Sequence, residues 1–190
     1  MRDSAAAVTL ERLWSPPTAV TAAYEGRASG LISSTAVSAS LLPESPRVVV
    51  VLSKANLTHD LVLASGAFAL HLLPAAPEDA LARALEVFRL LGMRSGHDVE
   101  KLDALAHQRG VTGSPLLDDA LAYIEARVAA SLDVGEVTVV AADVVAAGTL
   151  REGESLTIET VRARMPPEWL AEWDERRAQE ISAASRLRSR

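Results

Sequence analysis

Apolar and polar positions in the first third of the chain alternate in short runs that predict strands separated by tight turns. Residues 17–25 are typical of a strand, and Gly26 supplies the positive φ that the following reversal needs. Residues 28–41, rich in serine, threonine and small apolar side chains, continue as a second strand. The β-branched run over 47–53 indicates a buried strand, and residues 67–73 form the next one.

Helical signals interrupt these strands and dominate the middle of the chain. A short helix is predicted over 56–66, with Asn56 or Thr58 as its N-cap and a glycine at its end. A longer helix over 77–92 opens on a proline and two acidic residues, which suit a helix N-terminus. Its apolar residues recur at helical spacing, at Leu81, Leu85, Phe88 and Leu91. A third, shorter helix is predicted over 98–105.

The second half of the chain returns to strand patterns. Strands are predicted over 120–131 and 136–147, with Gly135 in the turn between them, and a further hairpin is predicted over 150–161. Two prolines at 166–167 begin a terminal helix. Because strands and helices do not alternate regularly, a doubly wound sheet is disfavoured. The order favours a small antiparallel barrel with helices on its outside.

Composition and charge narrow the class of protein. A length of 190 residues fits one domain with a helical appendage. Hydrophobic residues make up 49% but aromatic residues only 4%, so the core must be built from Val, Leu, Ile and Ala. A formal net charge of -6 argues against a general nucleic-acid binder. Basic residues near the C-terminus lie beside acidic ones and are interpreted as a solvated tail. They are Arg176, Arg177, Arg186, Arg188 and Arg190.

The cellular setting is predicted from what the sequence lacks. It contains no cysteine, which excludes disulfides, thiolate nucleophiles and cysteine-based zinc sites. No secretory signal is recognisable, and the longest aliphatic run, over 48–52, is far too short to span a bilayer. We therefore expect a soluble, cytoplasmic protein that binds neither nucleic acid nor membrane.

Hydroxyl side chains are concentrated in one predicted strand. Ser33, Ser34 and Thr35 are followed by Ser38 and Ser40. In a strand, Ser34, Ser38 and Ser40 share one face. Small polar residues there leave room for a flat ligand and donate hydrogen bonds to it. The alternative is an ordinary solvated face of a sheet.

A second candidate lies where the buried strand over 47–53 gives way to a helix. Free backbone donors at a helix start favour an anion. Ser53, Asn56 and Thr58 add neutral donors, and Lys54 adds a point charge, so the segment is a candidate phosphate cradle. The alternative is that Asn56 or Thr58 simply caps the helix while Lys54 is solvated.

These candidates belong to a longer series of motifs whose order and spacing resemble a known family. The segments are 20–21, 26–27, 30–35, 38–41, 46, 48–52, 54, 58–61 and 65–68, followed by 91–92, 95–102, 113–117, 122–128, 132–136 and 144–147. Together they resemble the flavin-reductase-like FMN-binding domain, over roughly residues 14–147. The run Ser95-Gly96-His97-Asp98 looks like a loop found in one branch of that family.

The resemblance implies a fold, a cofactor and an activity. The fold would be a mainly β, Greek-key split β-barrel over 1–165, with a helical insert over about 76–110. A C-terminal helix and tail over 166–190 would pack on the barrel or on the partner subunit. The protein would bind FMN and transfer a hydride from NAD(P)H to flavin. It would form a homodimer with FMN near the interface, and would act as the reductase partner of a monooxygenase.

The resemblance also assigns site residues. The flavin ring and ribityl chain would meet Ile32, Ser33, Ser34 and Thr35. The phosphate end would meet Ser53, Lys54, Asn56 and Thr58. No catalytic side chain is assigned, because the flavin itself carries the hydride, and no metal site is expected.

Three departures from the family pattern keep alternatives open. Val137 follows Gly135-Glu136 where many members have histidine, Ser34-Thr35 replaces Asn-Ser, and the loop over 42–45 is longer. The valine motivates an alternative, an FMN-binding redox or electron-transfer protein without NAD(P)H turnover. A second alternative is a cofactor-free barrel that serves as an interaction module.

The tryptophans bear on the predicted dimer, in which unpaired strand edges would also be covered. Trp14 precedes the first strand, whereas Trp169 and Trp173 are spaced i, i+4 in the terminal helix and form an apolar stripe with Leu170. This stripe either covers the protein's own barrel or crosses to the partner subunit and helps to roof the flavin site.

Overall fold

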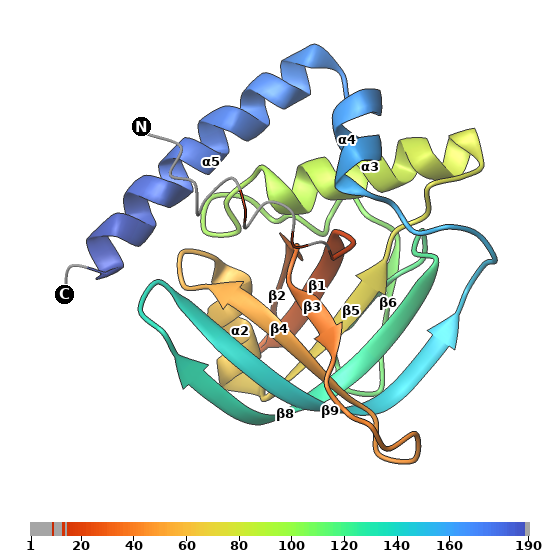
Figure 1. Ribbon diagram of the computed structural model, residues 1–190, viewed down its shortest axis with the longest axis vertical. Coiled ribbons are helices and arrows are strands. Elements are labelled where there is room, and N and C mark those ends of the chain that lie inside the picture. The colour runs from red at the N-terminus through yellow and green to blue at the C-terminus, as the bar shows by residue number, and fades with distance from the viewer. Residues whose placement is uncertain (1–8, 10–12, 14, 189–190) are drawn as a thin grey trace.

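A computed structural model describes residues 9, 13 and 15–188, so Trp14 lies outside the described residues. Seven strands form one curled antiparallel sheet in the order β2-β1-β5-β8-β9-β4-β3 (Figure 1). They are β1 (Thr18–Tyr24), β2 (Arg27–Ser33), β3 (Ala36–Ser38), β4 (Arg47–Ser53), β5 (Ala67–Leu72), β8 (Ala122–Asp133) and β9 (Val137–Thr149). A two-stranded sheet joins β6 (His107–Arg109) to β7 (Pro115–Leu117).

The curled sheet is closed into a barrel where the chain passes from β2 to β3. These two strands lie at opposite edges of the sheet, and the chain bends between them at Ser34. At the bend, Val51 of β4 donates its backbone N–H to the carbonyl of Thr35 at 3.1 Å, and the Ser33 hydroxyl donates to the Val51 carbonyl at 3.2 Å. We call this junction the seam. The prediction of a mainly β split barrel with helices is confirmed.

The prediction of one continuous strand over 28–41 was wrong at this point. Residues 27–33 pair with β1, whereas residues 36–38 pair with β4. Both halves are extended, so the hydrophobic pattern is that of a strand throughout. The pattern does not register that the chain changes its neighbour.

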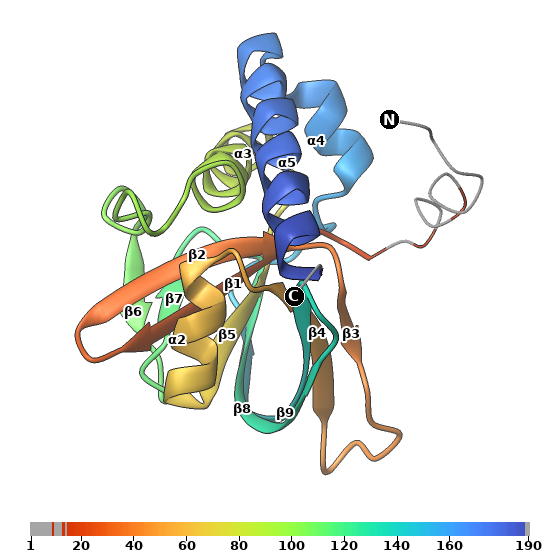
Figure 2. The same ribbon diagram turned by 90° about the vertical axis from the view of Figure 1, so that its left-hand side faces the viewer.

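Four helices lie outside the barrel in the described part of the chain. They are α2 (Leu57–Ser65), α3 (Glu78–Gly92), α4 (Ile158–Arg164) and α5 (Pro167–Arg188). In Figure 2, α3, α4 and α5 lie together on one side of the strands, and α2 packs beside β1 and β2. Within the described residues, no helix is both long enough and apolar enough to cross a membrane.

Two predicted elements are absent, so the helical insert over 76–110 consists of α3 followed by turns and β6. Residues 98–105 form turns instead of a helix, and within them the buried Lys101 donates to the carbonyls of Gly30 at 2.9 Å and Leu91 at 2.7 Å. Residues 150–161 are not a hairpin. A loop leads into α4, and Thr157 caps that helix by accepting the Thr160 N–H at 3.1 Å.

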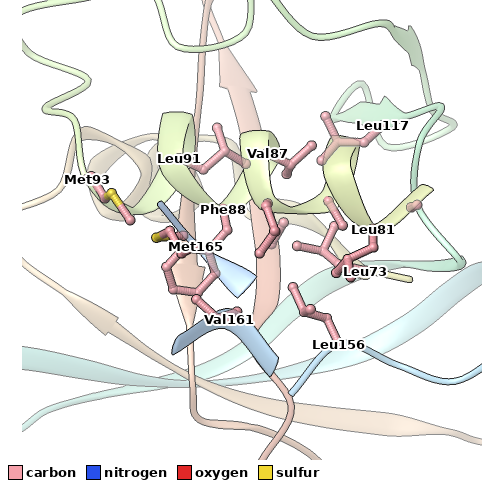
Figure 3. Packing of buried hydrophobic residues seen from close by; sticks show 14 of the residues in the cluster. Leu73, Leu81, Val87, Phe88, Leu91, Met93, Leu117, Leu156, Val161 and Met165 are labelled. Atoms are coloured by element: carbon pink, nitrogen blue, oxygen red, sulfur yellow. The ribbon is translucent and has the colours of Figure 1, made fainter. Parts of the chain in front are cut away.

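Two apolar clusters fill the molecule. Alternate residues of β4, namely Val48, Val50 and Leu52, point into the barrel, as expected for a strand with one buried face. The second cluster lies outside the barrel wall, beneath α3 and α4, and Figure 3 shows Val87, Phe88 and Leu91 of α3 facing it. Helix α3 therefore has most of its surface buried, and it fixes the outer layer to the sheet.

A neutral histidine joins three strands within this packing. His71 of β5 is fully buried. Its Nδ1 donates to the Ala19 carbonyl of β1 at 3.2 Å, and its Nε2 accepts the Leu117 N–H of β7 at 3.2 Å. Burial lowers the pKa of His71 to about 4, against weaker opposing effects from the Ala19 hydrogen bond and Glu125. The ring is thus neutral in the folded protein at pH 7.

We expect His71 to make stability fall in mild acid. Its folded pKa of about 4 lies below the ordinary 6.5, so between these values the unfolded chain takes up a proton and the folded protein does not. The free energy of unfolding should fall by about 2 kcal/mol between pH 7 and pH 5. Urea denaturation at the two pH values measures this. His71→Gln should lose most of the dependence, and His107→Gln, at an exposed position, should keep it. An unchanged pH dependence in His71→Gln contradicts the assignment.

Candidate active site

A cavity of about 810 Å³ lies between the barrel and the C-terminal helices. Its barrel side is formed by the ends of β2 and β4 and the starts of α2 and β9, and its opposite side by α4 and α5. In Figures 1 and 2 the last turns of α5 lie beside the β8–β9 turn and the end of β4. The volume falls within the range of cavities that hold cofactor-sized ligands.

The seam supplies four of the predicted site residues. Ile32, Ser33, Ser34 and Thr35 all line the cavity. The Ser33 hydroxyl holds the bend itself, because it accepts the Thr35 N–H at 3.2 Å as well as donating to Val51. Ser34 and Thr35 are exposed and line the cavity.

The start of α2 supplies two more. Ser53 and Asn56 line the same cavity. Asn56 stands at the N-cap position, but its side chain makes no capping hydrogen bond. The hydroxyl of Thr58, in the first turn, is fully buried and has no hydrogen-bond partner in the structure. The start of α2 therefore has no side-chain cap, and such a helix start has backbone donors free for an anion.

Lys54 and Thr58 are the two predicted site residues that do not line the cavity. The Lys54 ammonium binds the Asp133 carboxylate at 2.6 Å, which holds the pKa of Asp133 below its usual range. The backbone N–H of Lys54 donates to the backbone carbonyl of Glu136 at 3.1 Å. Lys54 thus ties the end of β4 to the β8–β9 turn, and its charge is already balanced.

The charged residues of the wall opposite the seam were not predicted from the sequence, whereas Trp173 was predicted as part of a stripe that could roof the flavin site. This wall includes Glu159 and Arg162 of α4 together with Trp173, Arg176, Arg177 and Glu180 of α5. Interpreting the C-terminal arginines as a solvated tail was wrong for Arg176, which is largely buried and pairs with Glu180. Arg177 is exposed, but it lines the cavity together with Arg176. Arg176 and Arg177 follow Trp173 at i+3 and i+4, and this spacing was the available signal.

Contacts with α3 of the same chain hold this wall in place. The Trp173 ring meets Phe88 edge-on, with centroids 5.2 Å apart, and the Arg89 guanidinium stacks 4.6 Å from the Trp169 ring. Trp169, Leu170 and Trp173 all pack against the apolar cluster under α3. Of the two predicted roles for the tryptophan stripe, the structure shows packing on the protein's own helices. Trp173 also borders the cavity.

Buried charge adjoins the inner end of the wall. The Nε of Arg176 lies 3.3 Å from the Oε1 of Glu180, and the two side chains form an ion pair. Burial lowers the pKa of Lys101 to about 8, with a smaller contribution from the positive charge of Arg176, while Glu180 acts in the opposite sense. Lys101 is therefore mostly protonated at pH 7, and it anchors the turns after α3 next to α5.

Comparison with known proteins places this geometry in a family. Residues 10–165 match the family model of the flavin reductase like domain. A curated relative, a ferric-chelate reductase (NAD(P)H) of Archaeoglobus fulgidus, is 34% identical over 139 residues, covering 73% of this chain and 78% of the relative. The chain belongs to the flavin reductase like family, and it is an oxidoreductase of the flavin reductase type.

Solved structures agree on the fold. An FMN-binding protein from Thermus thermophilus with bound p-hydroxybenzaldehyde is 25% identical, with a TM-score of 0.63 and 73% of each chain covered. A homologue of nitrilotriacetate monooxygenase component B from Mycobacterium thermoresistibile is 23% identical, with a TM-score of 0.65, covering 77% of this chain and 75% of that one.

We expect Trp173 to anchor α5. Trp173→Ala removes the edge contact with Phe88, and should lower the free energy of unfolding by about 2 kcal/mol. Ile181→Ala, at an exposed position of the same helix, is the matched control and should change stability little. Urea denaturation compares the two variants with the wild type. Equal stabilities for both variants would show that α5 is not held by this ring.

Proposed function

We propose that the protein is an NAD(P)H:flavin oxidoreductase that binds FMN in the cavity between the seam and α5. The observation that carries this proposal is that residues chosen from separate sequence motifs meet in one cavity. These residues are Ile32, Ser33, Ser34, Thr35, Ser53 and Asn56.

The chemistry of the cavity suits the two ends of FMN. Ser34 and Thr35 supply hydroxyls for the carbonyl and hydroxyl oxygens of the ring and ribityl chain. Asn56 and the uncapped start of α2 supply neutral donors for the phosphate. We keep Ser53, Lys54 and Thr58 in the proposed phosphate segment. Lys54 is paired with Asp133, so it would have to release this carboxylate in order to bind the phosphate.

The chemistry asks little of the side chains. Bound FMN supplies the acceptor for a hydride and the carrier that passes electrons on. The chain positions the ligand and shields one side of it from water, because Leu31, Phe88, Leu91 and Val137 form an apolar part of the cavity lining. The reduced flavin would serve a monooxygenase, which is consistent with the likeness to a monooxygenase component.

A second function is favoured by one observation. Val137 lines the cavity at the position where many members of the family carry histidine. A valine neither donates to nor accepts from a nicotinamide. An FMN-dependent redox protein that receives electrons from a source other than NAD(P)H would fit this lining.

Absorbance spectroscopy tests the proposal. The purified protein should carry flavin bands or take up added FMN, and the bands should bleach when NADH or NADPH is added without oxygen. Bleaching with dithionite alone would favour the second function. Failure to take up FMN would contradict both functions and favour an interaction module.

We also propose that the protein is a homodimer. Large apolar side chains are exposed on β3, β8 and β9 and in the β3–β4 and β8–β9 loops. They are Val37, Leu41, Leu42, Leu132, Val134 and Val145. Burial of such a surface against a second copy is favourable.

The dimer is tested by sedimentation equilibrium at micromolar concentration. The wild type should be dimeric, and Val145→Asp should shift it to monomer because a charge would be buried in the interface. Val111→Asp, at an exposed position outside these strands, should stay dimeric. A monomeric wild type contradicts the proposal.

A further inference from the structure

Part of one cavity wall lies beyond the residues that match the family model. The match to the family ends at residue 165, and α5 begins at Pro167. Nevertheless α5 contributes Trp173, Arg176, Arg177 and Glu180 to the cavity lining. The α5 part of this wall therefore lies outside the residues that match the family, whereas α4, which supplies Glu159 and Arg162, lies within them.

This wall has a defined position. Trp173 rests on Phe88, while Arg89 of α3 binds Glu172 of α5 at 3.2 Å and stacks on Trp169. Apolar, cation–π and ionic contacts thus hold this part of α5 against α3. Side chains on the next turn therefore meet the cavity from a fixed direction.

Among the described residues that line the cavity, positive charge comes from this side alone. The seam and the start of α2 contribute neutral side chains, and Lys54 is bound to Asp133. Arg162, Arg176 and Arg177 line the opposite wall, together with Glu159 and Glu180. Among the described lining residues, three arginines against two glutamates leave a net charge of +1, with Arg176 paired to Glu180 within the wall itself. An anionic ligand therefore finds hydrogen-bond donors on one side and charge on the other.

We propose that α5 completes the flavin site, and that Arg176 and Arg177 neutralise the phosphate of FMN opposite Asn56 and the start of α2. This proposal rests on the proposed binding of FMN in the cavity. Guanidinium groups suit a phosphate because their planar donors bind two oxygens at once. A helix start supplies only partial charge, so a phosphate dianion gains most from the arginines.

The proposal makes α5 the element that selects for a phosphorylated flavin. Riboflavin has the same ring and ribityl chain but no phosphate. It would contact the seam and Trp173 without using the arginines. The difference in affinity between FMN and riboflavin reports on all groups that bind the phosphate, and the part that is lost in variants of Arg176 and Arg177 reports on these two arginines.

The experiment titrates the full-length protein with FMN and with riboflavin, following the quenching of flavin fluorescence. The double variant Arg176→Gln/Arg177→Gln should weaken FMN binding by about 10- to 100-fold and leave riboflavin binding within about twofold of the wild type. The matched control is Arg186→Gln, at an exposed position on the same helix outside the cavity lining, which should change neither. Arg176→Lys/Arg177→Lys keeps the charge and should recover most of the FMN affinity.

Three results overturn the proposal. Equal weakening of FMN and riboflavin would mean that the arginines act only through the structure of α5. Unchanged FMN affinity with weakened NADPH affinity would assign them to the nicotinamide nucleotide. If the wild type binds neither flavin, the proposed function itself fails, and that outcome is recognised before any variant is made.

Discussion

The hydrogen bonds of Val51 across the seam are the constraint on which the remaining structure depends. Its N–H and carbonyl bind Thr35 and Ser33, on either side of the bend at Ser34. These bonds close the curled sheet between β2 and β4, strands that are not neighbours in the sheet order. The same bend moves the chain from one edge of the sheet to the other. Closing the barrel and presenting Ser34 and Thr35 at its mouth are therefore one structural event.

The opposite wall of the cavity depends on β2 through α3. A Cβ atom at Gly30 would lie 2.9 Å from the Cδ2 of Leu91, and one at Gly92 would lie 3.2 Å from the Cγ1 of Ile32. The two glycines thus allow α3 to approach β2 closely, which brings its C-terminal end to the cavity. Lys101 reinforces this contact by binding a carbonyl from each element. Since α5 packs on α3, and α3 packs on β2, the positions of both cavity walls depend on β2.

Elements determined by local patterns could be predicted from the sequence. The strands β1, β4 and β5 and the helices α2 and α3 lie within a residue or two of their predicted positions, because their apolar periodicity and terminal signals are local. Errors arose where the decisive contact is distant. The turns over 98–105 are shaped by Lys101 reaching Gly30, a contact 71 residues away in sequence.

The same limit applies to the site. Ser33–Thr35 and Asn56 were predicted from their motifs and line the cavity, since a hydroxyl cluster and a helix start are visible in short segments. The partners of the charged side chains near the cavity could not be predicted in this way. Whether Lys54 meets a phosphate or Asp133, 79 residues away, depends on how the β8–β9 turn folds back. Likewise, Arg176 and Arg177 looked like part of a solvated tail, because their spacing from Trp173 does not show that this ring anchors the helix on Phe88.

The most direct test of the central claim is a crystal structure of the protein with FMN bound. The account predicts electron density for the ring beside Ser34 and Thr35, with the phosphate between Asn56 and Arg176. Density for FMN at any other surface, or a phosphate directed away from both α2 and α5, would contradict it.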